Sequence, residues 1–403
     1  MKILITTDAY NTMVNGVAVS VNNLYQSLKE SGNDVRILTL AQTPFSYYEK
    51  DVYYIRSSAI KIYPDARGTM AFGDDLLEEI VEWEPEIIHS QCEFFTFVFA
   101  RKIAKRLNIP IIHTYHTLYE CYTHYFCPNK NMGRKLAGAF SKFICDQVDR
   151  VIAPTMKTAN LLESYGVNSE ITVIPTGISL ERLRRTVDKE ECEKLKETYG
   201  IPGQAPVMVT LGRLAQEKNV EFLIRQMRTP QIREAGIHFL IVGDGPDRER
   251  LEFLVKELEI ENVVHFAGMV SPEDVYKYYR LGDIFVSASQ SETQGLTYIE
   301  ALACGLPLVC FKDECLGQVL RPGWNGYYFE NEMDFSKNLI LAFQKKDELT
   351  KYAFETADEF SRETFGTRVL SLYKKVIEER KEAEKCIRFA CIPRQIWHRG
   401  MGC

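Results

Sequence analysis

Short apolar runs and amphipathic segments alternate along the chain in two successive series. The apolar runs of the first series, which have the length and composition of buried strands, lie at residues 3–6, 35–40, 87–89, 109–115, 151–152 and 172–174. A helical pattern separates the first two of them, at residues 17–30. The runs of the second series lie at residues 207–212, 238–243, 263–266, 284–287 and 307–311. Strands that alternate with helices indicate parallel sheets, so the sequence predicts two doubly wound α/β domains.

The boundary between the two series lies at residues 174–178, where Pro and Gly interrupt the pattern and a strongly charged stretch follows. We interpret this region as an interdomain hinge. The predicted domains are residues 1–175 and 176–365, with ligands expected at the C-terminal ends of the strands and in the cleft between the domains. Residues 366–403 contain a charged helix and a basic, apolar tail. The helix either ends the second domain or crosses back onto the first, and we expect the crossing.

Composition narrows the class of protein. A chain of 403 residues has room for two hydrophobic cores, and its net charge of −6 argues against general nucleic-acid binding. Its eleven cysteines lie far apart, which is typical of reduced thiols in a cytosolic protein. The apolar run at the N-terminus is shorter than that of a signal peptide. Residues 94–100 are also too few to span a bilayer, so we expect any membrane contact to be peripheral.

Candidate phosphate-binding residues follow the strands. Gly16 stands where the first helix begins, although a plain turn glycine would look the same. Arg213 and Lys218 follow the 207–212 run, and two fixed cations suit a departing pyrophosphate; a solvated surface pair is the alternative. Gly243 begins a tight turn, but Arg248 replaces the third glycine of the dinucleotide-binding pattern. This departure argues against an NAD-dependent dehydrogenase.

The most informative stretch is residues 289–307, in which Glu292 and Glu300 bracket a glycine turn and the start of a helix. Eight residues make ~2.2 helical turns, so we place Glu292 in the loop and Glu300 in the helix. A loop glutamate can face a sugar while backbone N–H groups at Gly295, Leu296 and Thr297 point at phosphate. Taken singly, either glutamate could equally be surface charge or a helix cap.

Together these residues resemble the retaining glycosyltransferases of family 4, which have the GT-B fold of two Rossmann-like domains facing across a cleft. The likeness extends over nearly the whole chain. It implies that Glu292 contacts the hydroxyls of the donor sugar and that Glu300 binds the nucleotide ribose. It also implies that Arg213 and Lys218 neutralise the diphosphate.

The resemblance extends to the first domain. Gly16 matches the glycine loop of the family, although Asn15 stands where many relatives carry another glycine. His116, just after the 109–115 run, matches a histidine that hydrogen-bonds the donor sugar near the reacting face. An isolated histidine would more often be structural, and we assign that role to His113.

Two segments point to a lipid acceptor. Residues 120–126 resemble the tyrosine-rich segment of family members that glucosylate diacylglycerol, which implies that Tyr122, His124 and Tyr125 border a lipid headgroup; core packing is the alternative. Residues 101–150 carry nine basic residues against three acidic ones. The basic residues Arg134, Lys135 and Lys142 accompany an apolar stripe of Leu136, Phe140, Phe143 and Ile144. Such a helix can lie in an anionic headgroup layer, unless its apolar stripe packs on the domain core.

The resemblance implies transfer of a hexose, expected to be glucose, from a UDP-sugar to membrane diacylglycerol with retention of the α configuration. The departing β-phosphate oxygen would take the proton of the acceptor. Because no Asp-x-Asp motif stands where the sugar donor would need one, we expect no metal and no other cofactor. We expect the protein on the cytoplasmic face of the membrane. Another lipid, a soluble sugar acceptor, an epimerase or a silent binding protein remain alternatives, and the oligomeric state stays open.

Overall fold

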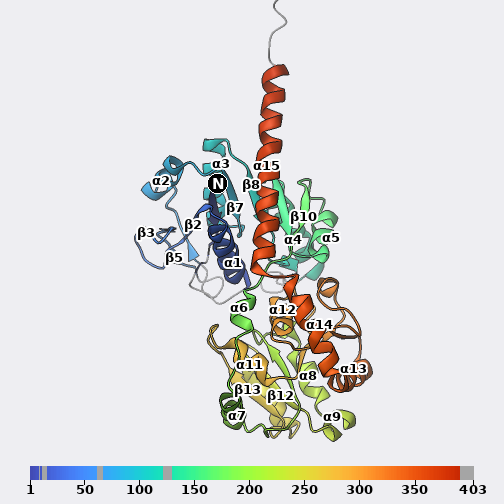
Figure 1. The fold of residues 1–403 in the computed structure, drawn as a ribbon. Helices are drawn as coiled ribbons and strands as arrows, with labels where there is room; N and C mark the ends of the chain where they lie inside the picture. Colours follow the sequence, from blue (N-terminus) through green and yellow to red (C-terminus); the bar gives the residue numbers. More distant parts are fainter. Residues whose placement is uncertain (9, 11–15, 61–66, 121–128, 391–403) are drawn as a thin grey trace, which may run out of the picture.

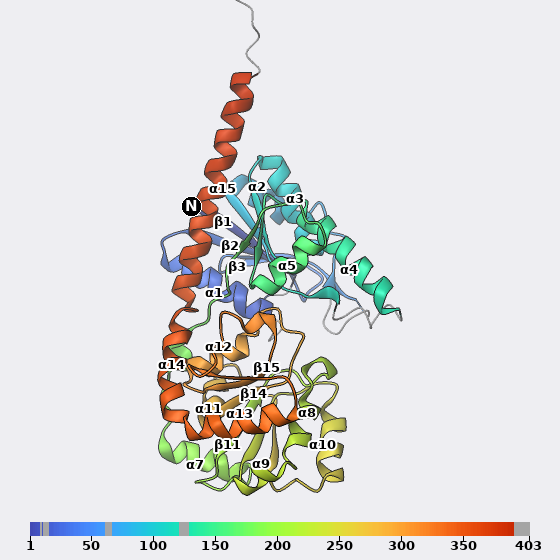
Figure 2. The same cartoon turned by 90° about the vertical axis from the view of Figure 1, so that its right-hand side faces the viewer.

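The computed structural model describes residues 1–8, 10, 16–60, 67–120 and 129–390. The predicted headgroup contacts Tyr122, His124 and Tyr125 lie outside these ranges, as does the tail at residues 391–403. Two α/β domains are stacked one above the other, and a long C-terminal helix runs from the second domain along the first (Figures 1 and 2).

The first domain is built on an eight-stranded sheet in the order β10-β9-β8-β7-β1-β2-β4-β3. Its strands are β1 (Lys2–Thr6), β2 (Asp34–Leu40), β3 (Tyr47–Glu49), β4 (Val52–Ile55), β7 (Ile87–Ser90), β8 (Ile111–Thr114), β9 (Arg150–Ala153) and β10 (Ile171–Val173). Neighbouring strands are parallel except β3 and β4. A short separate pair consists of β5 (Ser58–Ala59) and β6 (Arg67–Gly68).

Helices cover both faces of this sheet because successive strand residues point to opposite sides. In β1, Ile3 and Ile5 enter the core under α1 (Gly16–Glu30), whereas Leu4 enters the core on the other face. The helices of that other face are α2 (Asp75–Trp83), α3 (Phe95–Leu107), α4 (Lys130–Cys145) and α5 (Met156–Ser164). Both faces of the parallel sheet are therefore buried, as the apolar strand sequences predict.

The second domain has a six-stranded parallel sheet in the order β13-β12-β11-β14-β15-β16. Its strands are β11 (Val207–Leu211), β12 (His238–Val242), β13 (Val264–Gly268), β14 (Ile284–Ser287), β15 (Leu308–Phe311) and β16 (Gly326–Phe329). Its helices are α8 (Val220–Gln226), α9 (Pro230–Glu234), α10 (Arg248–Glu257), α11 (Val275–Leu281), α12 (Leu296–Ala303), α13 (Glu332–Gln344) and α14 (Lys346–Asp358). Strand order reverses at β1 in the first sheet and at β11 in the second, which are the positions where such sheets bind ligands.

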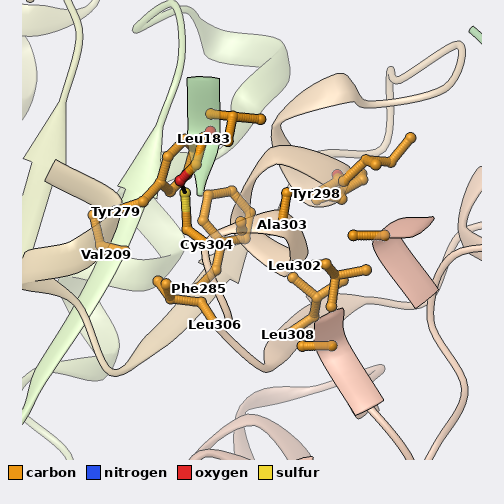
Figure 3. Packing of buried hydrophobic residues seen from close by; sticks show 14 of the residues in the cluster. Leu183, Val209, Tyr279, Phe285, Tyr298, Leu302, Ala303, Cys304, Leu306 and Leu308 are labelled. Atoms are coloured by element: carbon orange, nitrogen blue, oxygen red, sulfur yellow. Dashed lines mark hydrogen bonds between the residues drawn. The ribbon is translucent and has the colours of Figure 1, made fainter. Parts of the chain in front are cut away.

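The charged stretch after the boundary is folded, whereas the interpretation of residues 174–178 as a hinge stays a prediction. It forms α6 (Leu180–Leu183) and α7 (Lys189–Thr198), and both pack on the second domain. Figure 3 shows Leu183 beside Cys304, whose thiol donates to the Leu183 carbonyl at 3.3 Å. Apolar side chains within the stretch, such as Leu195, pack against the same core.

The C-terminal helix α15 (Arg362–Ala390) crosses back and packs along α1 of the first domain. Its buried side chains include Val369 and Tyr373, and the Tyr373 hydroxyl lies 2.5 Å from Nδ1 of His89 in β7. Further along, Glu379 accepts a hydrogen bond from the buried Arg150 at 2.6 Å. The helix therefore ties the two domains together along one side of the molecule (Figure 2).

Candidate active site

The loop between β14 and α12 carries Glu292 to the C-terminal edge of the second sheet. Gly295, with φ of 74°, makes the left-handed turn that begins α12, and a Cβ there would overlap the Tyr298 ring. Only glycine fits this turn. Because Gly295 has no side chain to cap the helix, the N–H groups of Leu296 and Thr297 remain available to an anion.

Lys218 and Glu292 form an ion pair at this edge, although 74 residues separate them in the chain. Lys218 Nζ lies 2.5 Å from Glu292 Oε1, and both side chains are partly buried. A short 3₁₀ helix (Gln216–Lys218) after β11 places the lysine, and the exposed Arg213 lies earlier on the same loop. The structure therefore brings together two residues that the sequence assigned to catalysis and places a third nearby.

Gly243 allows the loops after β11 and β12 to lie backbone against backbone. Its φ is 129°, and a Cβ there would overlap the Gly212 carbonyl. The Gly212 amide donates to the Val242 carbonyl at 3.0 Å in the same region. Close packing accounts for this glycine, and its contact with a sugar donor stays a prediction.

Glu300 lies in the second turn of α12, whereas Glu292 lies in the loop before this helix. Its Oε2 accepts a hydrogen bond of 2.9 Å from the hydroxyl of Tyr279 in α11. Burial raises the pKa of the Glu300 carboxyl above its usual value. The loop-and-helix placement predicted for the two glutamates is the one observed, whereas the contact of Glu300 with a ribose stays a prediction.

Gly16 faces α12 across the domain boundary. A Cβ at Gly16 would lie 3.8 Å from Leu296 Cδ1, so the first residues of α1 and α12 are neighbours. Figure 2 shows α1 at the base of the first domain, directly above α12. Two helix N-termini, each with a partial positive charge, therefore meet in the cleft near the Lys218–Glu292 pair.

His116 follows β8 and faces the cleft from the first domain. Its Nε2 lies 2.7 Å from Gln91 Oε1, so this nitrogen carries the proton that it donates to the amide oxygen. Burial lowers the pKa of His116 to about 4, so the ring is neutral near pH 7 and its Nδ1 can accept a hydrogen bond. His113 is fully buried in β8, with Nε2 3.5 Å from Glu93 Oε1, which fits the structural role predicted for it.

Side chains of the first domain form hydrogen bonds with the loop that carries Glu292. Lys157 Nζ donates to the backbone carbonyls of Gln290 (3.2 Å) and Glu292 (3.4 Å) and pairs with Asp313 at 2.7 Å. Thr155 Oγ1 donates to the Thr293 carbonyl at 2.8 Å. These contacts, all across the domain boundary, fix the backbone on either side of the predicted sugar-binding glutamate.

Two side chains of this loop, Thr293 and Gln294, form further hydrogen bonds with backbone groups outside it. Thr293 Oγ1 donates to the His116 carbonyl at 2.8 Å, and the Gln294 side chain pairs with both backbone groups of Thr176. The sequence analysis did not identify Thr155, Lys157, Thr293 or Gln294 as residues of the site. Thr293 and Gln294 stand inside the Glu292–Glu300 string, which was the available signal, but nothing in the pattern around Lys157 distinguishes it from an ordinary surface lysine.

The structure divides the predicted apolar stripe of α4 between two directions. Phe140 and Ile144 turn toward the core of the first domain, whereas Leu136 and Phe143 are 59% and 64% exposed. Met132 joins them at helical spacing, so an apolar stripe faces outward. Arg134 and Lys135, on the same helix, are exposed.

The basic excess of residues 101–150 is smaller at the surface than the sequence suggested. Arg150 is buried against Glu379, and Arg106 pairs with Glu78. Lys142 lies 2.7 Å from Asp146 Oδ2, and its Nζ also contacts the Gly166 carbonyl. These partners come from elsewhere in the chain or satisfy the charge locally. Arg134 also has an acidic neighbour, since its Nε lies 3.9 Å from Glu120 Oε2.

Across the residues that the structure describes, no helix is long and apolar enough to cross a membrane. The same residues include no group of three or more histidine, cysteine or acidic side chains that could hold a metal ion.

The fold and the cleft residues together define a glycosyltransferase of the GT-B type. Residues 14–182 match the family model described as Glycosyltransferase Family 4, and residues 191–360 match Glycosyl transferases group 1. The Streptococcus pneumoniae alpha-monoglucosyldiacylglycerol synthase is 32% identical over 93% of this chain and 85% of that protein. The Acholeplasma laidlawii protein of the same name is 29% identical over 94% of this chain and 98% of its own length. The chain belongs to glycosyltransferase family 4.

Solved structures of the same fold support the two-domain architecture. Anabaena HepE in complex with UDP and glucose has a TM-score of 0.72 at 17% identity, covering 93% of this chain and all of that one. The sucrose-phosphate synthase of Thermosynechococcus elongatus has a TM-score of 0.72 at 20% identity, over 94% of this chain and 99% of its own. The GT-B fold predicted from the sequence is confirmed.

Proposed function

We propose that the protein transfers glucose from UDP-glucose to membrane diacylglycerol with retention of the α configuration. The Lys218–Glu292 pair beside two converging helix N-termini carries this proposal, because it joins a cation for the diphosphate to a carboxylate for the sugar. The lipid acceptor is supported by the two relatives named as diacylglycerol glucosyltransferases, which this chain matches over nearly all of its length.

Fixed positive charge would stabilise the departing diphosphate. When the bond between the sugar C1 and the β-phosphate oxygen breaks, its electron pair leaves with UDP. Arg213, Lys218 and the N–H groups at the start of α12 would meet that charge, with Lys218 shared between the diphosphate and Glu292. We therefore propose a metal-independent reaction.

The sugar itself would lie between the two domains. Glu292 would accept hydrogen bonds from its hydroxyls, and the neutral His116 ring would accept another at Nδ1. The new bond forms between C1 and the acceptor oxygen on the face that UDP leaves. The acceptor proton then passes to the departing β-phosphate oxygen, which balances the reaction without a protein base.

The outward face of α4 would rest on the membrane. Its exposed apolar side chains, Leu136 and Phe143, can enter the headgroup layer while Lys135 meets anionic lipid. We propose peripheral attachment at the cytoplasmic face, where both UDP-sugars and anionic lipid are present.

The experiment that tests this function supplies UDP-glucose with dioleoylglycerol in anionic liposomes, and separately with soluble sugars. The proposal predicts a glucolipid as the main product. A soluble product alone would leave the glycosyltransferase intact and contradict the lipid acceptor. Formation of UDP-galactose without an acceptor would favour the epimerase instead.

A further inference from the structure

Asp8 stands at the C-terminal end of β1, at the strand where the order of the first sheet reverses. Its Oδ1 accepts hydrogen bonds from the backbone N–H (2.8 Å) and the hydroxyl (2.7 Å) of Thr96, in the first turn of α3. The Phe95 backbone N–H is a further donor to this carboxyl. A carboxylate has about four acceptor positions, so Asp8 keeps capacity to accept one more hydrogen bond. The side chain is partly exposed, although the mechanism above gives it no role.

The rings of Phe94, Tyr119 and Phe140 form an aromatic cluster. Phe94 lies two residues before Thr96, and Phe140 belongs to α4. Phe94 stacks on Phe140 at 6.0 Å between ring centres, and Tyr119 packs edge-on against both. Phe94 is 53% exposed, which is unusual for a ring with two aromatic neighbours. The Tyr119 hydroxyl donates to Glu93 Oε2 at 2.7 Å, which holds the cluster beside the loop after β7.

The cluster joins the outward face of α4 to Asp8. Phe140 lies four residues after Leu136 and three before Phe143, two of the apolar side chains exposed on that helix. Phe94 is close in sequence to Thr96, whose hydroxyl and amide hold Asp8. A series of aromatic contacts therefore links the proposed membrane face of α4 to the segment that holds Asp8.

We infer that Asp8 and the rings of Phe94, Tyr119 and Phe140 form the acceptor site. The Asp8 carboxylate accepts a hydrogen bond from the free hydroxyl of the lipid, and the rings contact its glycerol backbone and first acyl methylenes. The chemical identity of this acceptor, a neutral lipid with one hydroxyl, rests on the proposed function.

Asp8 orients the hydroxyl and does not keep its proton. The acceptor oxygen forms the new bond to C1, the bond from C1 to the β-phosphate oxygen breaks, and the proton ends on that oxygen. Burial, together with the nearby Glu93, raises the pKa of Asp8 to about 6. The carboxyl is therefore ionised near neutral pH and able to accept.

The competing role for Asp8 is structural, since it caps α3 through Thr96. Asp8→Asn separates the two roles, because the amide keeps an oxygen for Thr96 and loses the negative charge. We expect Asp8→Asn to lower kcat/KM for dioleoylglycerol roughly a hundredfold. UDP affinity and thermal midpoint should match those of the wild type.

Phe94→Ala tests the apolar half, with Phe253→Ala as a matched control on α10 of the other domain, where the ring is 67% exposed. Phe94→Ala should raise KM for dioleoylglycerol in mixed micelles several-fold and should raise KM for a short-chain diacylglycerol less. Phe253→Ala should change neither.

Normal lipid transfer by Asp8→Asn, or equal behaviour of Phe94→Ala and Phe253→Ala, would overturn the acceptor site. Loss of UDP binding together with transfer in Asp8→Asn would overturn it too, since that pattern indicates a structural role. If the wild type glucosylates only soluble sugars, the lipid assignment fails; Asp8→Asn with full activity on those sugars would then also refute the role of Asp8.

Discussion

The two sides of the cleft are built from different kinds of residues. The second domain presents paired charges on loops held by glycines, as at Lys218, Glu292 and Gly295. The first domain presents aromatic rings and apolar side chains. Of the fourteen large apolar side chains that are exposed among the described residues, ten lie between positions 45 and 156 and four lie after 250. The first domain therefore exposes more large apolar side chains than the second, which is consistent with the apolar acceptor proposed for it.

The two sides are nevertheless coupled through one loop. The contacts of His116, Thr155 and Lys157 with residues 290–293 make the position of Glu292 depend on the first domain. A substitution on the acceptor side can therefore affect the sugar donor, and kinetic experiments must separate the two effects.

The largest effect is expected from removing charge on the sugar-donor side. Lys218→Ala should lower kcat by roughly 100- to 1000-fold, because it removes a fixed cation that meets the departing diphosphate. Arg213→Ala should act in the same direction. Initial rates of glucolipid formation measure this loss, with the exposed Lys256→Ala on α10 as a control. Near-normal rates in both cleft variants would contradict the assignment.

A second experiment separates the two glutamates. Glu300→Gln should chiefly raise KM for UDP-glucose, because this residue lies in the helix against Tyr279 and away from the reacting face. Glu292→Gln and His116→Ala should chiefly lower kcat, by about tenfold to a hundredfold. Identical changes in KM and kcat for all three variants would show that the loop and the helix do not have separate roles.

The coupling loop can be tested through Lys157. Lys157→Met removes the donor to two loop carbonyls and should lower kcat by about tenfold, because Glu292 is no longer held in place. Lys157→Arg should restore part of the rate. An unchanged rate in Lys157→Met would mean that the second domain alone positions this loop.

The pH dependence of lipid transfer should also distinguish the acceptor side of the cleft from the sugar-donor side. Asp8 has a pKa raised to about 6, so lipid transfer should fall as pH drops through about 6, when Asp8 gains a proton and stops accepting. The nearby titratable groups are Glu93 and Cys92, and burial raises the pKa of that thiol, so it stays protonated. His116, with its pKa lowered to about 4, remains neutral in this range. UDP-glucose binding measured over the same pH values should not follow this transition, because its diphosphate lacks the terminal phosphate group that titrates with a pKa of about 6 in free UDP.

The smallest effects are expected at the membrane face. Leu136→Glu and Phe143→Glu should reduce sedimentation with anionic liposomes several-fold, and added salt should weaken binding of the wild type. Lys135→Glu should act similarly, whereas Lys142→Glu should act less because Lys142 is paired with Asp146. Phe253→Glu is the control on the second domain. Equal binding by all variants would mean that α4 does not face the membrane.

The sequence predicted the fold and the main cleft residues because these have local signatures. Strand and helix periodicity marked both sheets, and the glycine turn before α12 separated Glu292 from Glu300. Short edge strands such as β3 and β16 were not predicted, since three or four residues carry too little periodicity.

Contacts between distant residues were beyond the sequence pattern. Nothing local indicates that Lys218 would pair with Glu292, or that Asp8 would cap α3 through Thr96. The orientation of α4 was also misjudged in part, because spacing groups Phe140 with Phe143 on one side, whereas packing against Phe94 and Tyr119 turns Phe140 inward. Such details depend on tertiary packing, which cannot be inferred from the local pattern of apolar and polar residues.

The most direct test of a charged sugar-donor side facing an apolar acceptor side is one product analysis. The full chain is incubated with UDP-glucose and dioleoylglycerol in anionic liposomes, with EDTA present, and the purified product is examined by NMR. The account predicts glucosyl diacylglycerol with an α anomeric linkage at a rate that EDTA leaves unchanged. A β linkage, a complete loss of turnover with EDTA, or glucose found only on soluble acceptors would contradict it.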